Sequence, residues 1–191
     1  SPFLATMAFS ERTGLPSEVI EREPDGSIDI SKYDFSDSVV VVNCASNFDG
    51  RKLGNIKDIV KSVHKAGGII IIDAAQAMAH SADVLKGIEA DAICFSAHKL
   101  YAPSLGVIVW RDDLASKMAV GFVGGGMVDD VKRDSFLLSA EGKEHRYTRF
   151  EAGLQAWGEI IGFGAALDWI EKLPKSAWKN LENNSRELFD F

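Results

Sequence analysis

A carboxylate and an amine that could carry out chemistry follow two apolar runs of this chain. Asp73 closes "IIIID", with Gln76 shortly after it, and Lys99 follows "ICFSAH", which also contains Ser96 and His98. A lysine amine attacks carbonyl groups when its surroundings remove its proton, and a carboxylate stabilises a nearby positive charge. Each residue alone has a simpler interpretation: Asp73 could cap a helix, and a histidine–lysine pair is usually solvated. The combination favours a functional site.

The elements that must position these residues are predicted as alternating strands and helices. The runs "SVVVVNCA", "GIIIIDAA" and "DAICFSA" have the length and continuous apolar character of central parallel strands, and "LGVIVW" predicts a fourth strand. Apolar residues at helical spacing before a glycine pair predict a helix over residues 54–66. This alternation predicts an α/β fold, with a mainly parallel sheet flanked by helices.

Polar side chains also follow the first predicted strand, and they should lie near the polar residues that follow the second and third strands. Asn43, Ser46 and Asn47 follow that strand, and ligands of open parallel sheets bind at the carboxyl ends of the strands. All these groups are therefore expected to converge on one cavity. Further along, residues 129–149 are polar with little periodicity. A long helix is predicted over residues 153–173, and a second helix begins near Ser176, after the break at Pro174.

The composition limits what the chain can bind. Its 191 residues carry a formal charge of −7 and a pI near 5.1, so no nucleic-acid partner is expected, because no basic stripe could neutralise phosphates. No apolar run reaches the roughly 18 residues needed to span a bilayer, so no membrane association is expected. Cys44 and Cys94 lack the spacing of zinc ligands or of a disulfide framework. They are interpreted as buried structural thiols, which fits a cytoplasmic location.

Longer motifs connect the chain with a known family. "IIIIDAAQAMAHSADV" followed by "DAICFSAHKLYAPSLGVIVW", and later "GFVGGGMV" and "RYTRFEAGLQAWGEIIGFGAALDWIEKL", resemble the class V group of fold-type I pyridoxal-phosphate enzymes. Within that group the chain is most similar to cysteine desulfurases of the SufS/NifS type. The resemblance runs from about residue 25 to residue 173, and it implies the large domain of a fold-type I transferase.

The resemblance implies pyridoxal 5'-phosphate as cofactor and assigns roles to the motif residues. Lys99 would hold the cofactor as a Schiff base and later shuttle protons. Asp73 would stabilise the protonated pyridine nitrogen, which makes the ring a better electron sink. The other implied contacts are Gln76 and Asn47 with the phenolic oxygen, and Ser96 and His98 with the phosphate.

The same resemblance implies an enzyme that acts on a small amino acid, with removal of sulfur from L-cysteine as the best single hypothesis. An aminotransferase, a kynureninase-like hydrolase or an epimerase could carry the same residues, and a non-catalytic scaffold relative is a further alternative. The family also implies a homodimer with active sites at the subunit interface and, for a desulfurase, a sulfur-acceptor protein as partner.

Several departures from the family pattern bear on this hypothesis. Leu154 stands where the family has a threonine that donates to the phosphate of a neighbouring subunit, and Cys44 stands at a histidine position. "YAPSLGV" is shorter than the corresponding family segment and lacks its first glycine. The N-terminal elements that stack on the ring and hold its phosphate are expected to be absent. Residues 1–173 are therefore predicted as part of the large domain, and 174–191 as the start of a passage to an absent small domain bearing the persulfide cysteine.

Overall fold

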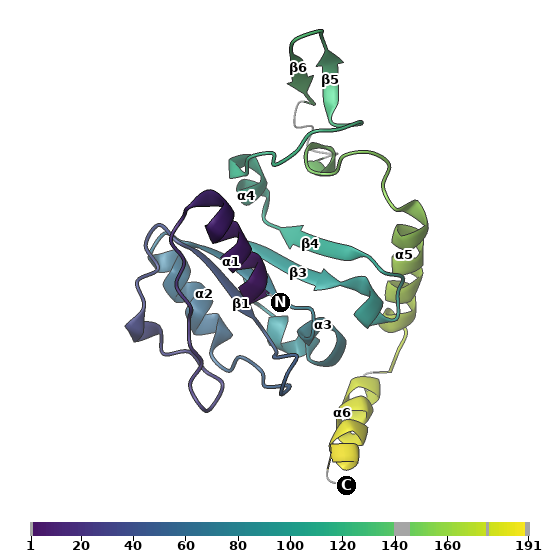
Figure 1. Cartoon of the computed structure of the whole chain (residues 1–191). Helices are drawn as coiled ribbons and strands as arrows, with labels where there is room; N and C mark the ends of the chain where they lie inside the picture. Colours follow the sequence, from purple (N-terminus) through teal and green to yellow (C-terminus); the bar gives the residue numbers. More distant parts are fainter. Residues whose placement is uncertain (1, 140–145, 175, 190–191) are drawn as a thin grey trace.

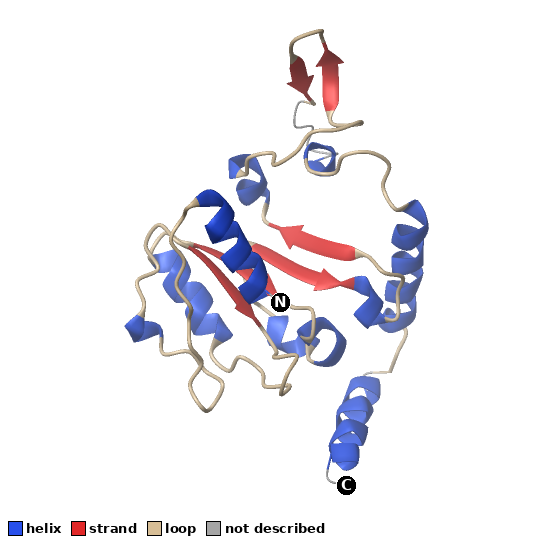
Figure 2. Cartoon of the chain, viewed as in Figure 1, coloured by secondary structure: helices blue, strands red, loops and turns tan. Residues whose placement is uncertain are grey.

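The computed structural model describes residues 2–139, 146–174 and 176–189. Its centre is a four-stranded sheet in the order β1-β2-β3-β4, formed by Val39–Asn43, Ile69–Asp73, Ala92–Ser96 and Gly106–Trp110. The first three strands are parallel, and β4 runs antiparallel to β3. Figures 1 and 2 show this sheet with helices on both faces. The predicted α/β fold with a mainly parallel sheet is confirmed.

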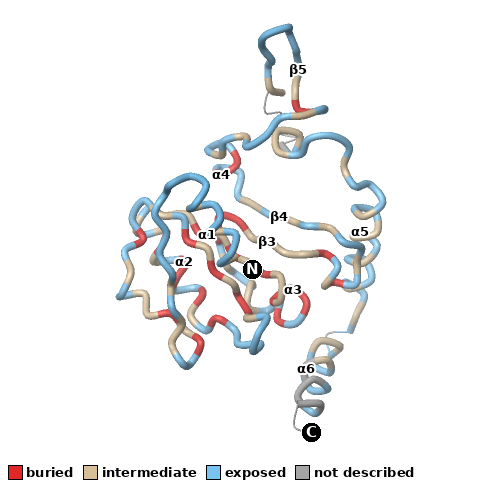
Figure 3. The backbone as a smooth tube through the Cα atoms, in the orientation of Figure 1, coloured by how far each residue is buried: buried red, intermediate tan, exposed pale blue. Residues whose placement is uncertain are grey.

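One face of the sheet is packed against helix α2 (Ile56–Lys65). Four apolar residues of α2 recur at helical spacing and are buried, namely Ile56, Ile59, Val60 and Val63. They join a core that includes alternate residues of β1 and β2: Val40, Val42, Ile70 and Ile72. The helix predicted over residues 54–66 is therefore confirmed, with slightly tighter bounds. Figure 3 shows buried residues along this helix and the neighbouring strands.

The opposite face of the sheet is less completely covered. Helix α1 (Pro2–Thr13) lies across β1 on this side (Figure 1), and Phe3 and Met7 of α1 line a hollow together with Val41 of β1. No residue of α1 is buried. This helix was not predicted, because its apolar residues do not form one consistent helical face.

Shorter elements connect and extend the sheet. The short helices are η1 (Ile30–Lys32), α3 (Ala77–His80), η2 (Ala82–Leu85), η3 (Ala97–Leu100), α4 (Asp112–Lys117) and η4 (Arg146–Arg149). A hairpin of β5 (Val128–Val131) and β6 (Phe136–Leu138) projects away from the main sheet (Figure 2). The hairpin falls in the stretch 129–149, where no periodicity was detected, because its strands are short and a register shift interrupts their pairing. Residues 140–145 of that stretch lie outside the described residues.

Two helices follow the hairpin. Helix α5 (Trp157–Glu171) begins later than the predicted residue 153. Gly153 has a left-handed backbone with φ of 82°, and its N–H donates to the carbonyl of Gly125 at 2.7 Å, so this residue forms a turn before the helix. Helix α6 (Ser176–Phe189) begins at the predicted residue. Within the described ranges, no helix is both long and apolar enough to cross a membrane. The predicted division at residue 173 stays a prediction.

A buried carboxylate connects several elements at the amino-terminal ends of the parallel strands. Asp91, directly before β3, is 7% exposed. It accepts a hydrogen bond from the backbone N–H of Ile70 at 2.8 Å, and it contacts His64 Nε2 at 2.9 Å. Its second oxygen lies 3.3 Å from Arg111, which follows β4. One side chain therefore joins α2 and three strands on the side of the sheet opposite to the predicted site.

Candidate active site

A cavity of about 150 Å³ lies at the carboxyl ends of β1 and β2. This is the edge of the sheet at which the polar residues were predicted to converge. The cavity is lined by Asp73, Gln76, Asn47 and Lys99 of the predicted site, together with Pro2, Asn43, Ala45 and Ala75. The structure therefore brings together four of the six predicted residues, and it adds Asn43, which sequence analysis had noted only as a polar residue at a strand end.

Asp73 is the last residue of β2, and its carboxylate is oriented locally. Its Oδ1 accepts a hydrogen bond from the N–H of Ala75 at 2.9 Å. Helix α3 is capped by Gln76 instead, without a side-chain hydrogen bond, so the helix-capping interpretation of Asp73 is wrong. Asp73 is the register partner of Asn43 on β1, and side chains at paired positions of parallel strands share one face. That face is opposite to the packed face of Ile72.

Lys99 is carried by the short helix η3, between the buried residues Ala97 and Leu100. The N–H of Ala97 donates to the carbonyl of Leu105 at 2.8 Å, which ties η3 to the start of β4. Tyr101 ends η3 in a left-handed conformation with φ of 62°, and its ring lies edge-on to Trp169 of α5 at 5.5 Å. The segment that carries the lysine therefore contacts both the sheet and α5.

Ser96 and His98 are close to Lys99 in the sequence, but neither is among the described residues that line the cavity. Ser96 is the last residue of β3 and is partly buried, whereas His98 is exposed on η3. Their predicted contacts with a phosphate group stay predictions.

The two cysteines flank Asp73 on either side. Burial first, and the negative charge of Asp73 second, raise the pKa of the Cys44 thiol to about 12. The same two causes raise the pKa of the Cys94 thiol. Cys44 is 1% exposed, so the interpretation as a buried thiol is confirmed, while Cys94 is more exposed than predicted. The described residues contain no cluster of side chains able to hold a metal ion.

Sequence analysis missed Arg22, which approaches the cavity from the segment between α1 and β1. Its Nη2 donates to the backbone carbonyl of Asn43 at 2.5 Å and to the side-chain Oδ1 of Asn43 at 2.8 Å. Burial is the largest influence on the Arg22 guanidinium and lowers its pKa, against the opposing charge of Asp49. No local pattern in the sequence signals a contact between a loop arginine and a distant strand end.

The chain is similar in sequence to a family of known enzymes. Residues 1–189 match the family model described as aminotransferase class-V. The chain is 36% identical over 145 residues to a probable cysteine desulfurase of Haemophilus influenzae, and this alignment covers 75% of this chain and 32% of that protein. The chain is also 30% identical over 181 residues to a cysteine desulfurase of Pectobacterium atrosepticum, and that alignment covers 92% of this chain and 43% of the relative.

Solved structures give the same picture of the fold. The apo structure of a cysteine desulfurase from Thermococcus onnurineus matches with a TM-score of 0.76 and 30% identity, over 88% of this chain and 42% of that one. A cysteine desulfurase from Escherichia coli matches with a TM-score of 0.77 and 24% identity, over the same shares. The chain thus spans less than half the length of these relatives.

Proposed function

The chain belongs to the class-V aminotransferase family, and on that premise we propose that it provides the cofactor-binding part of a pyridoxal-phosphate enzyme that removes sulfur from L-cysteine. The observation that carries the proposal is the shared cavity of Asp73, Gln76 and Lys99. The names of the similar proteins favour cysteine over other small amino acids as substrate.

The residues that line the cavity fit pyridoxal phosphate in their chemistry. The cofactor has a ring nitrogen that can carry a proton, a phenolic oxygen that accepts hydrogen bonds, and an aldehyde that reacts with an amine. The cavity offers a carboxylate from Asp73, carboxamides from Gln76 and Asn47, and an amine from Lys99. Each reactive position of the cofactor therefore has a counterpart of suitable chemistry on the wall.

The bound cofactor supplies an electron sink for the bonds at the substrate Cα. The Asp73 carboxylate would hold a proton on the ring nitrogen, and its hydrogen bond from Ala75 keeps Oδ1 fixed while it does so. Gln76 and Asn47 would orient the ring through its phenolic oxygen. The Lys99 Nζ would bind the cofactor covalently and, once released by the substrate, move a proton at the substrate Cα.

The remaining expectations belong to the same proposal. Ser96 and His98 would contact the phosphate group. A homodimer is the assembly that the family implies, but Leu154, which is 93% exposed where the family has an intersubunit threonine, has no hydroxyl to donate to a phosphate group. The two free cysteines support a cytoplasmic location. A sulfur-acceptor protein would be the partner.

We assign the sulfur-accepting thiol to neither cysteine of this chain. A thiol must ionise to act as a nucleophile, and burial together with the charge of Asp73 raises the pKa of both Cys44 and Cys94. Both thiols therefore stay protonated near neutral pH and are suited to packing rather than to sulfur transfer.

The proposal is tested by supplying the protein with pyridoxal phosphate, L-cysteine and an excess of a small thiol, and by measuring alanine and sulfide. The added thiol takes the place of the sulfur-accepting cysteine: one thiol takes the sulfur of the substrate, and a second thiol then releases it as sulfide and forms the disulfide. We expect the two products in equal amounts, and we expect Lys99→Ala to form neither. Lys57→Ala, which removes an exposed lysine of α2, is the matched control and should leave the rate unchanged. Protein that retains the cofactor but turns over another amino acid in preference to cysteine would contradict the desulfurase assignment and favour another class V enzyme.

A further inference from the structure

The contact between Arg22 and Asn43 connects a loop to the wall of the candidate cofactor cavity. One guanidinium nitrogen of Arg22 donates to both oxygens of Asn43, the backbone carbonyl and the side-chain Oδ1. A second nitrogen, Nη1, donates to the carbonyl of Arg51 at 3.4 Å. A guanidinium group has several donors in one plane, so these bonds fix the position of the Asn43 side chain.

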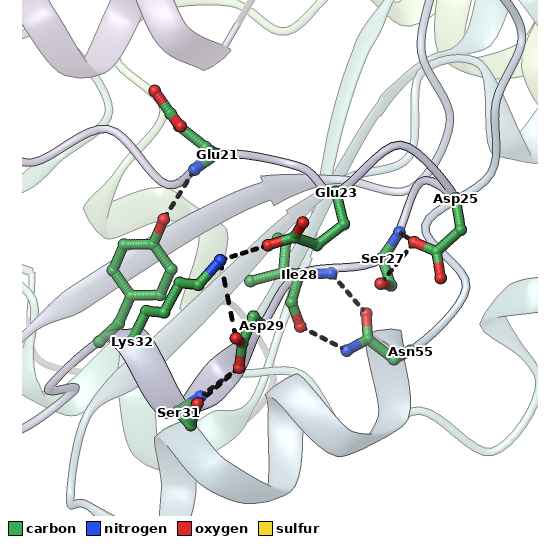
Figure 4. A network of polar contacts seen from close by, with 10 residues as sticks. Glu21, Glu23, Asp25, Ser27, Ile28, Asp29, Ser31, Lys32 and Asn55 are labelled. Atoms are coloured by element: carbon green, nitrogen blue, oxygen red, sulfur yellow. Dashed lines mark hydrogen bonds and ion pairs between the residues drawn. The ribbon is translucent and has the colours of Figure 1, made fainter.

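The segment that carries Arg22 is itself held in place, as Figure 4 shows. Asn55 accepts from the N–H of Ile28 at 3.1 Å and donates to the carbonyl of Ile28 at 2.7 Å. On either side of Arg22, the N–H of Glu21 donates to the hydroxyl of Tyr33 at 3.0 Å, and Glu23 pairs with Lys32 at 2.5 Å. Arg22 therefore extends from a segment whose backbone is fixed before any ligand binds.

The Arg22 contact also determines which way the Asn43 amide faces. A guanidinium can only donate, so the atom that meets it must be the oxygen of the amide, and Nδ2 must point the other way. Nδ2 donates one hydrogen to the carbonyl of Ala45 at 3.3 Å. Its second hydrogen has no acceptor among the described residues. Asn43 lines the cavity beside its register partner Asp73.

We propose that Asn43 is a further ligand-contacting residue of this cavity, which donates its second Nδ2 hydrogen to an acceptor atom of the cofactor bound against Asp73. Arg22 is its positioning residue, because it holds the amide in the donating orientation without lining the cavity itself. This inference rests on the proposed function, since it takes pyridoxal phosphate as the occupant of the cavity.

If Arg22 acts only through Asn43, substitutions of the two residues should affect the dissociation constant of the cofactor in a non-additive way. Loss of one hydrogen bond to a ligand weakens binding by roughly two- to tenfold. We expect Asn43→Ala and Arg22→Ala each to raise the dissociation constant of pyridoxal phosphate within this range. The double variant should bind no more weakly than Asn43→Ala alone, because Arg22 acts only through Asn43. Arg22→Lys, which retains a charge but loses the planar fork, should fall between Arg22→Ala and the parent.

Arg12→Ala is the matched control. Arg12 is an exposed arginine of α1, an element other than those that carry Arg22 and Asn43, and its guanidinium lies over the ring of Phe9. We expect its affinity for the cofactor to equal that of the parent.

The experiment is a titration of cofactor-free protein with pyridoxal phosphate, followed by tryptophan fluorescence, with the melting temperature of each cofactor-free variant measured in parallel. Unchanged affinity in Asn43→Ala would overturn the inference, as would affinity losses from Arg22→Ala and Asn43→Ala that multiply in the double variant. Parent protein that does not bind the cofactor would overturn the proposed function and this inference together. Parent protein that binds it, with Asn43→Ala binding equally well, would overturn the inference alone.

Discussion

Asp73 and Lys99 line the same cavity, although one closes a central strand and the other sits on a short helix beyond the neighbouring strand. The geometry follows from the parallel pairing of β2 with β3, which brings the carboxyl ends of both strands to one edge of the sheet. A flat heterocycle between the two side chains would meet a carboxylate on one side and an amine on the other. This relationship underlies the functional proposal.

The first prediction concerns the charge of Asp73. Asp73→Asn removes the negative charge expected beside the ring nitrogen while keeping a side chain of the same size. We expect the cofactor to remain attached, because Lys99 is unchanged, while the rate of cysteine turnover falls by about a hundredfold or more. Asp83→Asn, at an exposed position of η2, is the control. A rate close to that of the parent in Asp73→Asn would contradict the role given to this carboxylate.

The second prediction tests how α5 supports the segment that carries Lys99. A Cβ atom at Gly162 would lie 2.6 Å from a ring carbon of Pro103, which follows η3. We expect Gly162→Ala to lower the free energy of unfolding by about 1 kcal/mol or more, because the rigid proline ring must shift. Gly164→Ala, two residues on in the same helix, meets no atom and should raise stability slightly through helix propensity. Equal effects at both glycines in urea unfolding would show that α5 does not pack on Pro103.

The third prediction concerns the far edge of the sheet. Asp91→Ala leaves the buried N–H of Ile70 without its acceptor, and an unsatisfied buried donor costs about 1–3 kcal/mol. Asp113→Ala also removes a carboxylate that pairs with Arg111, but on the exposed surface, where ion pairs contribute little. Denaturant titration should therefore separate the two variants. An Asp91→Ala protein as stable as Asp113→Ala would mean that Asp91 does not fasten this edge.

The fourth prediction is a dependence of stability on pH that originates in Cys44. Burial raises the pKa of this thiol to about 12 in the folded chain, while an unfolded chain releases the proton near pH 8.5. The folded state therefore binds more protons above pH 8.5, so its stability falls as pH rises toward 12, by at most about 1.4 kcal/mol per pH unit. Below pH 8.5 the thiol contributes no dependence.

The comparison that isolates this effect is Cys44→Ala, measured by urea unfolding between pH 7.5 and 10, a window chosen around that unfolded value of about 8.5. We expect the variant to be less stable at neutral pH but to lose less stability than the parent as the pH rises. Parallel losses in both proteins would show that the Cys44 thiol ionises equally in the folded and unfolded chains.

The sheet and most of the cavity could be predicted because their signals are local. Continuous apolar runs such as residues 69–72 mark central strands, and a polar residue directly after such a run must lie at the ligand-binding edge. Asp73, Gln76, Asn47 and Lys99 were found by this reasoning together with the family motifs. The antiparallel direction of β4 was left open, because an apolar run does not specify direction.

Other features depend on contacts between distant segments. The pairing of Arg22 with Asn43 joins a loop to a strand end, and nothing in "EREPDG" distinguishes this arginine from a solvated one. Helix α1 lacks a buried face, so amphipathic periodicity could not reveal it. His98 follows a strand end as Lys99 does, yet it is exposed, because the turn of η3 points adjacent side chains in different directions.

The most direct measurement is to reduce the protein with borohydride in the presence of pyridoxal phosphate and to locate the modified lysine by peptide mass spectrometry. A single phosphopyridoxyl group on Lys99, absent from Lys99→Ala and lost when a cofactor analogue without an aldehyde competes for the cavity, is the result that we predict. Modification spread over exposed lysines such as Lys52 and Lys57, with Lys99 unlabelled, would contradict the assignment of this cavity as the cofactor site.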